Sequence, residues 1–387
     1  MNPFMNHQII CVSPVDWRDL RQRPQILMEF FRELTPVLYL NPVGLRSFRV
    51  SDAGRVAKKF SSFFVRGRKQ AGKGGIEVIT PLYIPFLRAR NINRFFYQRL
   101  ARSLAEKTPL LKGGKPMLWI GVPSPLAVFL LENLDHSLAV YDCMDDFAGF
   151  HGGAAHIRED EITIVQNVDL VMTASQTLLD RLAPQARMAR LAPNGVDSEA
   201  FHPGTAKPEL PSDMKSGGPV IGYHGAIREW FDGDLIRTMA KSRPSWQIVL
   251  IGPVAPTMDL TGLPANVRLL GPKPHDQLPV YLRWFDVGII PFTEIPVAFN
   301  SNPIKTYEYL AAGLPVVSSP IAELMKFDRV VRIASGADEF IRAIDQALDE
   351  SGSARLIEER IALAEANSWQ RVFQGILDIL RESGRLE

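Results

Sequence analysis

The chain of 387 residues has only two cysteines, Cys11 and Cys143. Two cysteines provide neither a disulfide framework nor the ligand spacing of a zinc site. Each lies inside a short apolar run, where a thiol is usually a small buried hydrophobe. We therefore expect no disulfide and no bound metal, which suits a reducing compartment.

Long hydrophobic segments are missing as well. No run of 18 apolar residues occurs, so the sequence predicts no membrane-spanning helix. Residues 1–8 lack the apolar core of a signal peptide. No Gly-x-Gly-x-x-Gly pattern occurs, which argues against a dinucleotide-dependent oxidoreductase. These observations predict a cytoplasmic protein.

Acidic residues are scarce in one long segment. Residues 46–115 contain 17 lysines and arginines but three acids, a net charge of 17 − 3 = +14, whereas the whole chain carries +2. Aromatic and aliphatic residues are interleaved with these charges, as in surfaces that bind an anionic membrane leaflet. We expect this segment to hold the protein at the inner face of the cytoplasmic membrane. We expect no nucleic acid, because no nucleic-acid module accompanies the charge. The alternative is a soluble basic surface whose aromatic residues lie in the core.

Short apolar runs alternate with helical patterns along the chain, which predicts two doubly wound α/β domains with parallel sheets. The predicted strands of the first half are 9–12, 37–40, 117–120, 138–141 and 170–173, and its predicted helices include 24–34, 91–106 and 175–182. The predicted strands of the second half are 220–223, 247–251, 267–269, 286–291 and 315–318, and its predicted helices are 232–241, 275–284, 303–312 and 337–348.

The domain boundaries follow from a composition change. Residues 205–219 are rich in Pro, Gly, Ser and Lys, as domain linkers often are. We expect an N-terminal domain over 1–204, a linker over 205–218 and a C-terminal domain over 219–367. An amphipathic helix over 368–387 is expected to pack back toward the N-terminal domain. A ligand site is expected in the cleft between the two sets of strand ends.

The segment Asn300–Pro320 carries the clearest signal of a binding site. Pro303 and Gly313 predict a helix over 303–312 with Asn302 as its N-cap. Lys305 lies in the first turn, where the helix macrodipole already makes the field positive, so an anion bound there is favoured. Glu308, one turn later, adds an acceptor for hydroxyl groups. The alternative is an ordinary solvated pair of Lys305 and Glu308, worth at most about 0.5 kcal/mol.

Several motifs resemble those of a known enzyme family, in order along nearly the whole chain. They are Pro303-Ile-Lys-Thr-Tyr-Glu-Tyr-Leu-Ala-Ala-Gly-Leu-Pro-Val-Val317, Ala192-Pro-Asn-Gly-Val-Asp197 with Phe201-His-Pro203, Ile221-Gly-Tyr-His-Gly-Ala-Ile-Arg-Glu-Trp-Phe-Asp232, Gln22-Arg-Pro-Gln25 and Tyr141-Asp-Cys-Met-Asp-Asp146. They resemble GT-B glycosyltransferases, above all the large retaining family (family 4, group 1) that builds bacterial exopolysaccharides and cell-surface polysaccharides.

The resemblance implies the GT-B fold, in which two Rossmann-like domains face an inter-domain cleft. It implies transfer of a sugar from a nucleotide-diphosphate sugar to a polyprenyl-diphosphate-linked or oligosaccharide acceptor. The family retains the configuration of the sugar, and GT-B enzymes usually need no metal, so we expect no cofactor beyond the donor substrate.

The resemblance also assigns the donor side of the site. Glu308 would accept hydrogen bonds from the ribose hydroxyls, and Lys305 and Arg228 would stabilise the diphosphate leaving group. Backbone groups around Gly225 and Ile304, at the start of the helix, would assist them. The sugar pocket would be lined by Asn300, Ser301 and Asn302. The family commonly carries a glutamate where this chain has Asn300, which affects the identity of the donor sugar. For Arg228 the alternative is a solvated charge at a helix entry.

The first domain offers the acceptor-side candidates. Asp145 or Asp146, which follow a predicted strand, would orient the acceptor hydroxyl or take its proton as catalytic residues. Their alternative role is to cap the next helix. Asp142 and three residues after the first strand, Asp16, Trp17 and Arg23, are further acceptor-side candidates. Arg23 is equally well placed for a structural salt bridge.

Two other functions stay open at this point. A nucleotide-sugar 2-epimerase shares the fold, but it would need its own acid and base around the sugar and has no use for a membrane-facing surface. A non-catalytic nucleotide-sugar-binding regulatory subunit is the second, because Asn300 replaces a family carboxylate.

Overall fold

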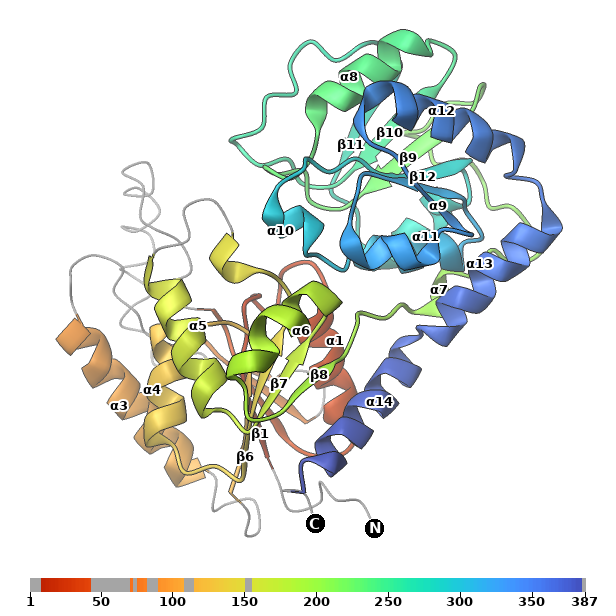
Figure 1. Cartoon of the computed structure of the whole chain (residues 1–387). Coiled ribbons are helices and arrows are strands. Elements are labelled where there is room, and N and C mark those ends of the chain that lie inside the picture. Colours follow the sequence, from red (N-terminus) through yellow and green to blue (C-terminus); the bar gives the residue numbers. More distant parts are fainter. Residues whose placement is uncertain are drawn as a thin grey trace. The chain divides into compact units, whose positions relative to one another are not determined.

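The computed structural model describes residues 8–42, 70–71, 75–81, 90–107, 115–149 and 155–384. By its contacts the chain divides into two compact units (Figure 1). Unit 1 holds the described residues up to Ala192 and those from Gly375 onward, and unit 2 runs from Pro193 to Gln374. Residues 205–218, expected as a linker, lie inside unit 2. There the Asp213 carboxylate accepts hydrogen bonds from Lys273 at 2.6 Å and Tyr281 at 3.0 Å.

Unit 1 is built on an eight-stranded sheet in the order β3-β4-β2-β1-β5-β6-β7-β8. Its strands are parallel except for the short β3, which pairs antiparallel with β4. The strands are β1 (Ile9–Val12), β2 (Val37–Leu40), β3 (Gln70–Ala71), β4 (Ile76–Ile79), β5 (Met117–Ile120), β6 (Leu138–Cys143), β7 (Leu170–Thr173) and β8 (Ala189–Leu191). The inner strands are buried at every position, because a parallel sheet is covered on both faces.

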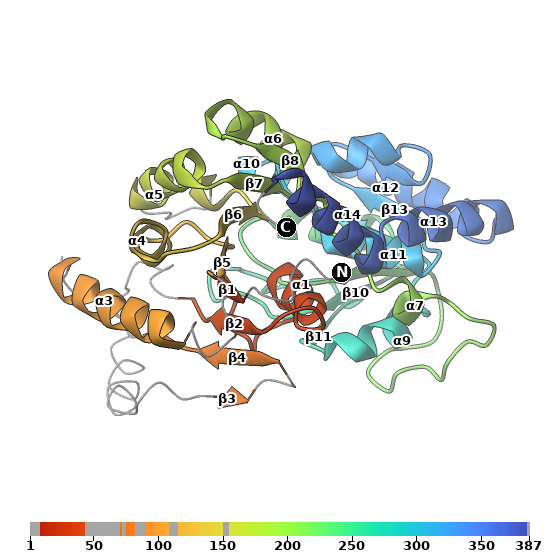
Figure 2. The same ribbon diagram turned by 90° about the horizontal axis from the view of Figure 1, so that it is seen from below.

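The helices of unit 1 lie on both faces of this sheet. They are α1 (Arg23–Phe31), α3 (Arg90–Lys107), α4 (Pro125–Asn133), α5 (Ala155–Asn167) and α6 (Gln176–Leu182). In Figure 2, α3, α4 and α5 stand in a row along one face, and α1 lies on the other. This arrangement is the doubly wound fold that the alternating pattern predicted.

Unit 2 contains a six-stranded parallel sheet in the order β11-β10-β9-β12-β13-β14. The strands are β9 (Val220–His224), β10 (Gln247–Ile251), β11 (Val267–Gly271), β12 (Val287–Ile290), β13 (Val316–Ser318) and β14 (Val331–Ile333). The strand order reverses between β9 and β12, and in open α/β sheets ligands bind outside the carboxyl ends of the strands at such a switch point. His224 and Ile290 are the last residues of the two strands that flank it.

Helices cover both faces of this second sheet. The helices of unit 2 are α7 (Ser198–Phe201), α8 (Gly233–Ser242), α9 (Leu278–Leu282), α10 (Pro296–Phe299), α11 (Ile304–Ala311), α12 (Gly336–Asp349) and α13 (Ala354–Ala366), and α14 (Trp369–Glu382) begins in this unit. In Figure 1, α8 and α12 lie on one side of the sheet, and α9 and α11 on the other. The expected fold class, two parallel-sheet Rossmann-like domains, is confirmed.

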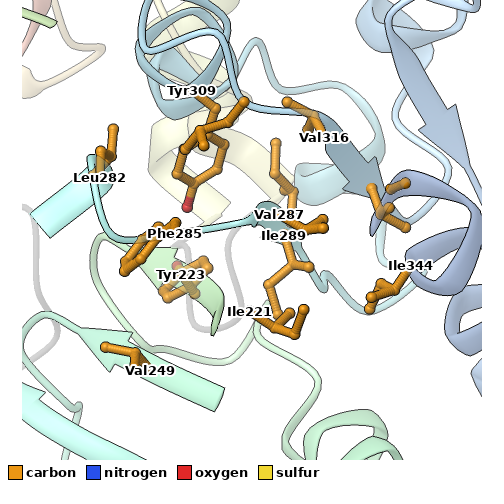
Figure 3. Packing of buried hydrophobic residues seen from close by; sticks show 14 of the residues in the cluster. Ile221, Tyr223, Val249, Leu282, Phe285, Val287, Ile289, Tyr309, Val316 and Ile344 are labelled. Carbon is orange, nitrogen blue, oxygen red and sulfur yellow. The ribbon is translucent and has the colours of Figure 1, made fainter. Parts of the chain in front are cut away.

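Two glycines let aromatic rings pack closely on the sheet beside the switch point. Gly222 of β9 and Gly288 of β12 are register partners. A Cβ atom on Gly288 would lie 2.6 Å from the ring of Tyr309, and one on Gly222 would lie 2.0 Å from the ring of Phe285. Tyr309 is fully buried, and its hydroxyl oxygen, red in Figure 3, is directed from the helix toward the strands. It accepts a hydrogen bond from the backbone N–H of His224 at 3.0 Å.

The sequence prediction for α11 is right at its C-terminal end and wrong at its N-cap. Gly313 has φ +74°, and its N–H donates to Leu310 while that of Leu314 donates to Tyr309, so the helix ends in a Schellman motif as expected. The prediction of Asn302 as N-cap is wrong by one residue, because α11 begins at Ile304 with Pro303 in the cap position. The carbonyl of Pro303 accepts the first hydrogen bond, from Thr306 at 3.1 Å.

The last helix belongs to both units. The N–H of Trp369 at its start donates to the carbonyl of Val196 in unit 2, and Glu382 at its end pairs with Arg190 of unit 1 at 3.1 Å. Among the described residues, no helix is both long and apolar enough to cross a membrane.

Candidate functional site

The switch point of unit 2 carries a cation from α11. The Nζ of Lys305 lies 5.4 Å from the ring centroid of Tyr223 in β9 and 5.0 Å from that of Phe292, just after β12. The ammonium group therefore stands over the ends of both strands that border the switch point. Gly225 follows β9 with φ +123°, and a Cβ there would lie 2.9 Å from Cε of Lys305. Only glycine lets the loop backbone approach the lysine in this way.

Glu308 lies one turn along α11 and is 4 % exposed. Its Oε1 is 2.8 Å from Nε2 of His275, and its Oε2 is 3.2 Å from Nε2 of His224. Burial acts to raise the pKa of Glu308, but His224, His275 and Lys305 together hold the pKa below its ordinary value. The carboxylate is therefore ionised at neutral pH and can only accept hydrogen bonds.

His224 is the buried neighbour of this carboxylate. It is 5 % exposed, and burial, with Lys305 and His275, lowers its pKa to about 4 although Glu308 acts in the opposite direction. His224 is therefore neutral at neutral pH. At this end of the sheet Glu308 supplies a carboxylate and Lys305 an ammonium group. A buried acceptor beside a cation at a helix start can bind a hydroxyl-bearing phosphate ester.

The segment before β9 supports the site from the side. The side-chain amide of Asn194 donates to the backbone carbonyl of Asn302 at 2.7 Å. Phe201, at the end of α7, is 1 % exposed and meets His275 edge-on, with ring centroids 5.4 Å apart. Residues 193–201 thus hold both the start of α11 and the histidine that contacts Glu308.

The remaining donor-side candidates lie around the same two loops. Arg228 follows Gly225 in the loop after β9, partly exposed, with its guanidinium 5.9 Å from the ring centroid of Trp230. Asn300 ends α10, and the Ser301 hydroxyl donates to the carbonyl of Ala298 at 2.7 Å. Ile304 is the first residue of α11. The donor-side residues predicted from the sequence therefore lie in two places in the fold. One is the start of α11 with the residues just before it, and the other is the loop after β9.

In unit 1, two of the acceptor-side candidates bind each other. Nε of Arg23 donates to both carboxylate oxygens of Asp142 at 3.0 Å, and Nη2 is 2.8 Å from Oδ1. The two side chains are 0 % and 2 % exposed. The alternative raised for Arg23, a structural salt bridge, is what the structure contains. Such a pair is costly to break, because removing one partner leaves a buried charge at a cost of roughly 3–5 kcal/mol.

Asp145 and Asp146 follow β6 and differ in their surroundings. Asp146 is 8 % exposed, and its carboxylate lies 3.6 Å from Nη2 of Arg181. The same arginine donates to buried Glu161 at 2.6 Å, so it links the two acidic groups. Asp145 is partly exposed and its backbone carbonyl lies 3.4 Å from the thiol of Cys143. Asp146 is thus the more buried member of the pair.

Asp16 and Trp17 lie in the loop after β1, which borders the strand-order reversal of unit 1. The Asp16 carboxylate accepts from the N–H of Arg18 at 3.0 Å. The N–H of Trp17 donates to the side chain of Asn41 at 3.0 Å, and its ring meets that of Tyr39 edge-on at 4.9 Å. Both side chains are partly exposed, unlike Arg23 and Asp142.

Comparison with known proteins adds the family. Residues 218–350, most of unit 2, match the family of glycosyl transferases group 1. The chain is 28% identical over 306 residues to the putative teichuronic acid biosynthesis glycosyltransferase TuaH of Bacillus subtilis, covering 73% of this chain and 76% of that protein. The chain is a glycosyltransferase whose second unit carries a group 1 domain. The matched region contains every donor-side residue named above.

Solved structures support the same fold along the whole glycosyltransferase chain. The sucrose-phosphate synthase of Thermosynechococcus elongatus superposes with a TM-score of 0.70 at 15% identity, covering 97% of this chain and 98% of that one. Anabaena HepE in complex with UDP superposes with a TM-score of 0.67 at 13% identity, covering 97% and 100%. HepE has also been solved with UDP-glucose.

Two residues of this glycosyltransferase site were not predicted from the sequence. His224 and His275 are 84 and 33 residues from Glu308 along the chain and meet it only because β9, the turn before α9 and α11 converge. The sequence signals for His224 were its position one residue after the predicted strand 220–223 and its place in a family motif. Within the described residues, no group of three or more His, Cys, Asp or Glu side chains is arranged to hold a metal ion.

Proposed function

We propose that this glycosyltransferase moves a sugar from a nucleoside-diphosphate sugar to a lipid-linked or polysaccharide acceptor in cell-surface polysaccharide synthesis, with retention and without a metal. The observation that carries the proposal is the buried, ionised Glu308 one helical turn from Lys305 at the switch point of unit 2. The similarity to a teichuronic acid glycosyltransferase and to HepE, solved with UDP-glucose, supports the acceptor class and the donor class respectively.

The donor side of the proposal follows from charge. Cleavage of the bond between the sugar and the diphosphate leaves negative charge on the diphosphate, and fixed positive groups lower that barrier. Lys305 supplies a full charge, and the N–H groups at the start of α11 supply dipoles directed at the same place. Arg228 is the second cation. Glu308 accepts from the ribose hydroxyls, while Asn300, Ser301 and Asn302 contact the sugar.

The acceptor side is assigned to unit 1. Asp145 or Asp146 orients the acceptor hydroxyl and takes its proton, and the partial exposure of Asp145 favours it over the buried Asp146. Asp16 and Trp17 contact the acceptor. The burial of Arg23 and Asp142 against each other favours a structural role for both.

The proposed location is the inner face of the cytoplasmic membrane, through the basic segment 46–115. Most of that segment lies outside the described residues; 70–71, 75–81, 90–107 and 115 are described. In α3, Arg94, Arg99 and Arg102 are exposed, and Phe95 is 52 % exposed with the Arg99 guanidinium 5.8 Å from its ring centroid. An exposed aromatic residue among cations suits an anionic lipid surface.

The proposal is tested by measuring release of nucleoside diphosphate from a panel of nucleotide sugars, with and without a polyprenyl-diphosphate-linked acceptor. Acceptor-stimulated release is the expected result. A change in the sugar without release would instead identify a nucleotide-sugar 2-epimerase. Tight nucleotide binding with neither outcome would identify a regulatory subunit, the reading that Asn300 favours.

A further inference from the structure

The carboxylate of Glu308 is held by a histidine from another element of unit 2. Nε2 of His275 lies 2.8 Å from Oε1 of Glu308. An ionised carboxylate has no proton to give, so Nε2 of His275 is the donor in this contact. The histidine therefore carries its ring proton on Nε2 or is doubly protonated. In either form Nε2 donates a hydrogen bond to Oε1 of Glu308, and this bond fixes the plane of the carboxylate.

The ring of His275 is itself positioned by its surroundings. It begins the turn His275–Gln277 that leads into α9, and Phe201 of α7 packs edge-on against it. Its side chain is 31% exposed, whereas that of Glu308 is 6% exposed. His275 thus stands between solvent and the carboxylate, with one face supported by a buried phenyl ring.

The second oxygen of Glu308 faces a different neighbour. Oε2 lies 3.2 Å from Nε2 of His224, a buried nitrogen that has no hydrogen-bond partner among the described residues. The contact is close but lacks hydrogen-bond geometry, so Oε2 keeps accepting capacity. A carboxylate held at one oxygen and open at the other is oriented for a hydroxyl pair on a ligand.

We propose that His275 is a positioning residue for ribose recognition: by holding Oε1 of Glu308 it aims the carboxylate at the ribose hydroxyls and so makes the site distinguish ribonucleotides from 2′-deoxyribonucleotides. The inference rests on the proposed function, because it assumes that Glu308 binds the ribose. Without His275 the carboxylate can rotate about its last side-chain bond, and hydrogen bonds to both ribose hydroxyls are no longer favoured together.

The test compares nucleotide pairs by calorimetry on the full chain. The tightest of UDP, GDP, ADP and CDP is chosen with the wild type, and its 2′-deoxy form is then titrated into wild type, His275→Ala and His275→Gln. We expect the wild type to prefer the ribonucleotide by on the order of tenfold, the loss of one charge-assisted hydrogen bond. His275→Ala should bring the ratio close to one, and His275→Gln, whose amide can donate to Oε1, should restore much of it.

The outcomes separate the inference from the function on which it rests. A ratio in His275→Ala equal to that of the wild type would overturn the inference and leave the proposed function standing. Equal loss of affinity for both nucleotides would also overturn it, because that pattern indicates structural damage alone. A wild type that binds none of the four nucleotides contradicts the proposed function and the inference with it. His202→Ala, which changes a histidine one residue beyond α7, is the matched control and should keep the wild-type ratio.

Discussion

At the residue scale, the site depends on two buried side chains in contact, a neutral His224 and an ionised Glu308. Glu308 keeps its charge because the groups around it outweigh the penalty of burial, and His224 gives up its charge because burial outweighs Glu308. In the folded protein Glu308 is therefore ionised and His224 is neutral. The consequence is a buried negative group, Glu308, that can accept hydrogen bonds from hydroxyls and lies near the positive side chain of Lys305.

His224 gives a pH prediction. Its pKa is about 4 in the folded protein against an ordinary 6.5, so between these values the unfolded chain binds a proton that the folded chain does not. Stability therefore falls as pH drops from about 6.5 to about 4, by about 3 kcal/mol in total from this group. His224→Asn removes the effect, so its melting temperature should fall less than that of the wild type between pH 7 and pH 4.5.

Scanning calorimetry at the two pH values measures this difference. His156→Asn, a substitution of an exposed histidine in α5, is the control and should follow the wild type. Equal pH responses of His224→Asn and wild type would show that His224 does not stay neutral in the folded protein.

At the element scale, the site exists because one loop and one helix approach each other closely. Gly225 has a positive φ, and any Cβ there would meet the Lys305 side chain at 2.9 Å. Gly225→Ala should therefore move Lys305 and lower the affinity for a nucleoside diphosphate by on the order of tenfold, since one charge-assisted contact is lost. Titration calorimetry with the tightest-binding nucleotide measures it.

Gly262→Ala is the matched control for this substitution. Gly262 also has a positive φ, of +67°, but a Cβ there meets nothing within 4 Å. Both variants should lose about 1–2 kcal/mol of stability from backbone strain, while only Gly225→Ala should lose affinity. If the two variants bind nucleotide equally well, the close approach of Gly225 to Lys305 has no part in binding.

Local chemistry explains which elements could be predicted from the sequence. Strands such as Met117–Ile120 and Gln247–Ile251 were predicted with the observed bounds, because continuous apolar runs between turns leave few alternatives. Helix α4 was missed, since Pro123, Ser124 and Pro125 looked like an interruption of an apolar run. In the structure Ser124 is its N-cap and Pro125 its first residue, the favoured place for a proline.

The predicted helix 275–284 is the clearest case in which tertiary structure, and not the local sequence pattern, decides the secondary structure. It divides into a tight turn, His275–Gln277, and a short helix, α9, that has Pro279 in its first turn. The turn places His275 against Glu308, a contact that no periodicity could indicate. The donor-side motif could thus be located from sequence, whereas its two histidine neighbours required the fold.

At the scale of the whole molecule, the two doubly wound sheets have different candidate site residues at their strand-order reversals. Unit 2 gathers the donor-side residues at the strand-order reversal between β9 and β12, and unit 1 places Asp16 and Trp17 beside its own reversal between β1 and β5. The described part of the basic segment belongs to unit 1. One fold used twice therefore separates the proposed donor, acceptor and membrane functions between units.

The membrane proposal leads to a prediction for the whole protein. Vesicles that contain anionic lipid should sediment the protein at low salt and release it at high salt, because the attraction is screened. Replacing Arg94, Arg99 and Arg102 of α3 together by Glu should weaken sedimentation. The matched control replaces three exposed arginines of unit 2, Arg342, Arg355 and Arg371, by Glu and changes the net charge equally. Equal binding to neutral vesicles, or equal effects of the two triple variants, would contradict the prediction.

The most direct test of the central claim is calorimetric titration of a nucleoside diphosphate into Glu308→Ala. Glu308 is proposed to bind both ribose hydroxyls, so the affinity should fall at least about tenfold while the melting temperature confirms that unit 2 is folded. Glu161→Gln, which alters a buried glutamate of unit 1, should bind as the wild type does. An unchanged affinity in Glu308→Ala would show that the nucleotide does not bind at α11.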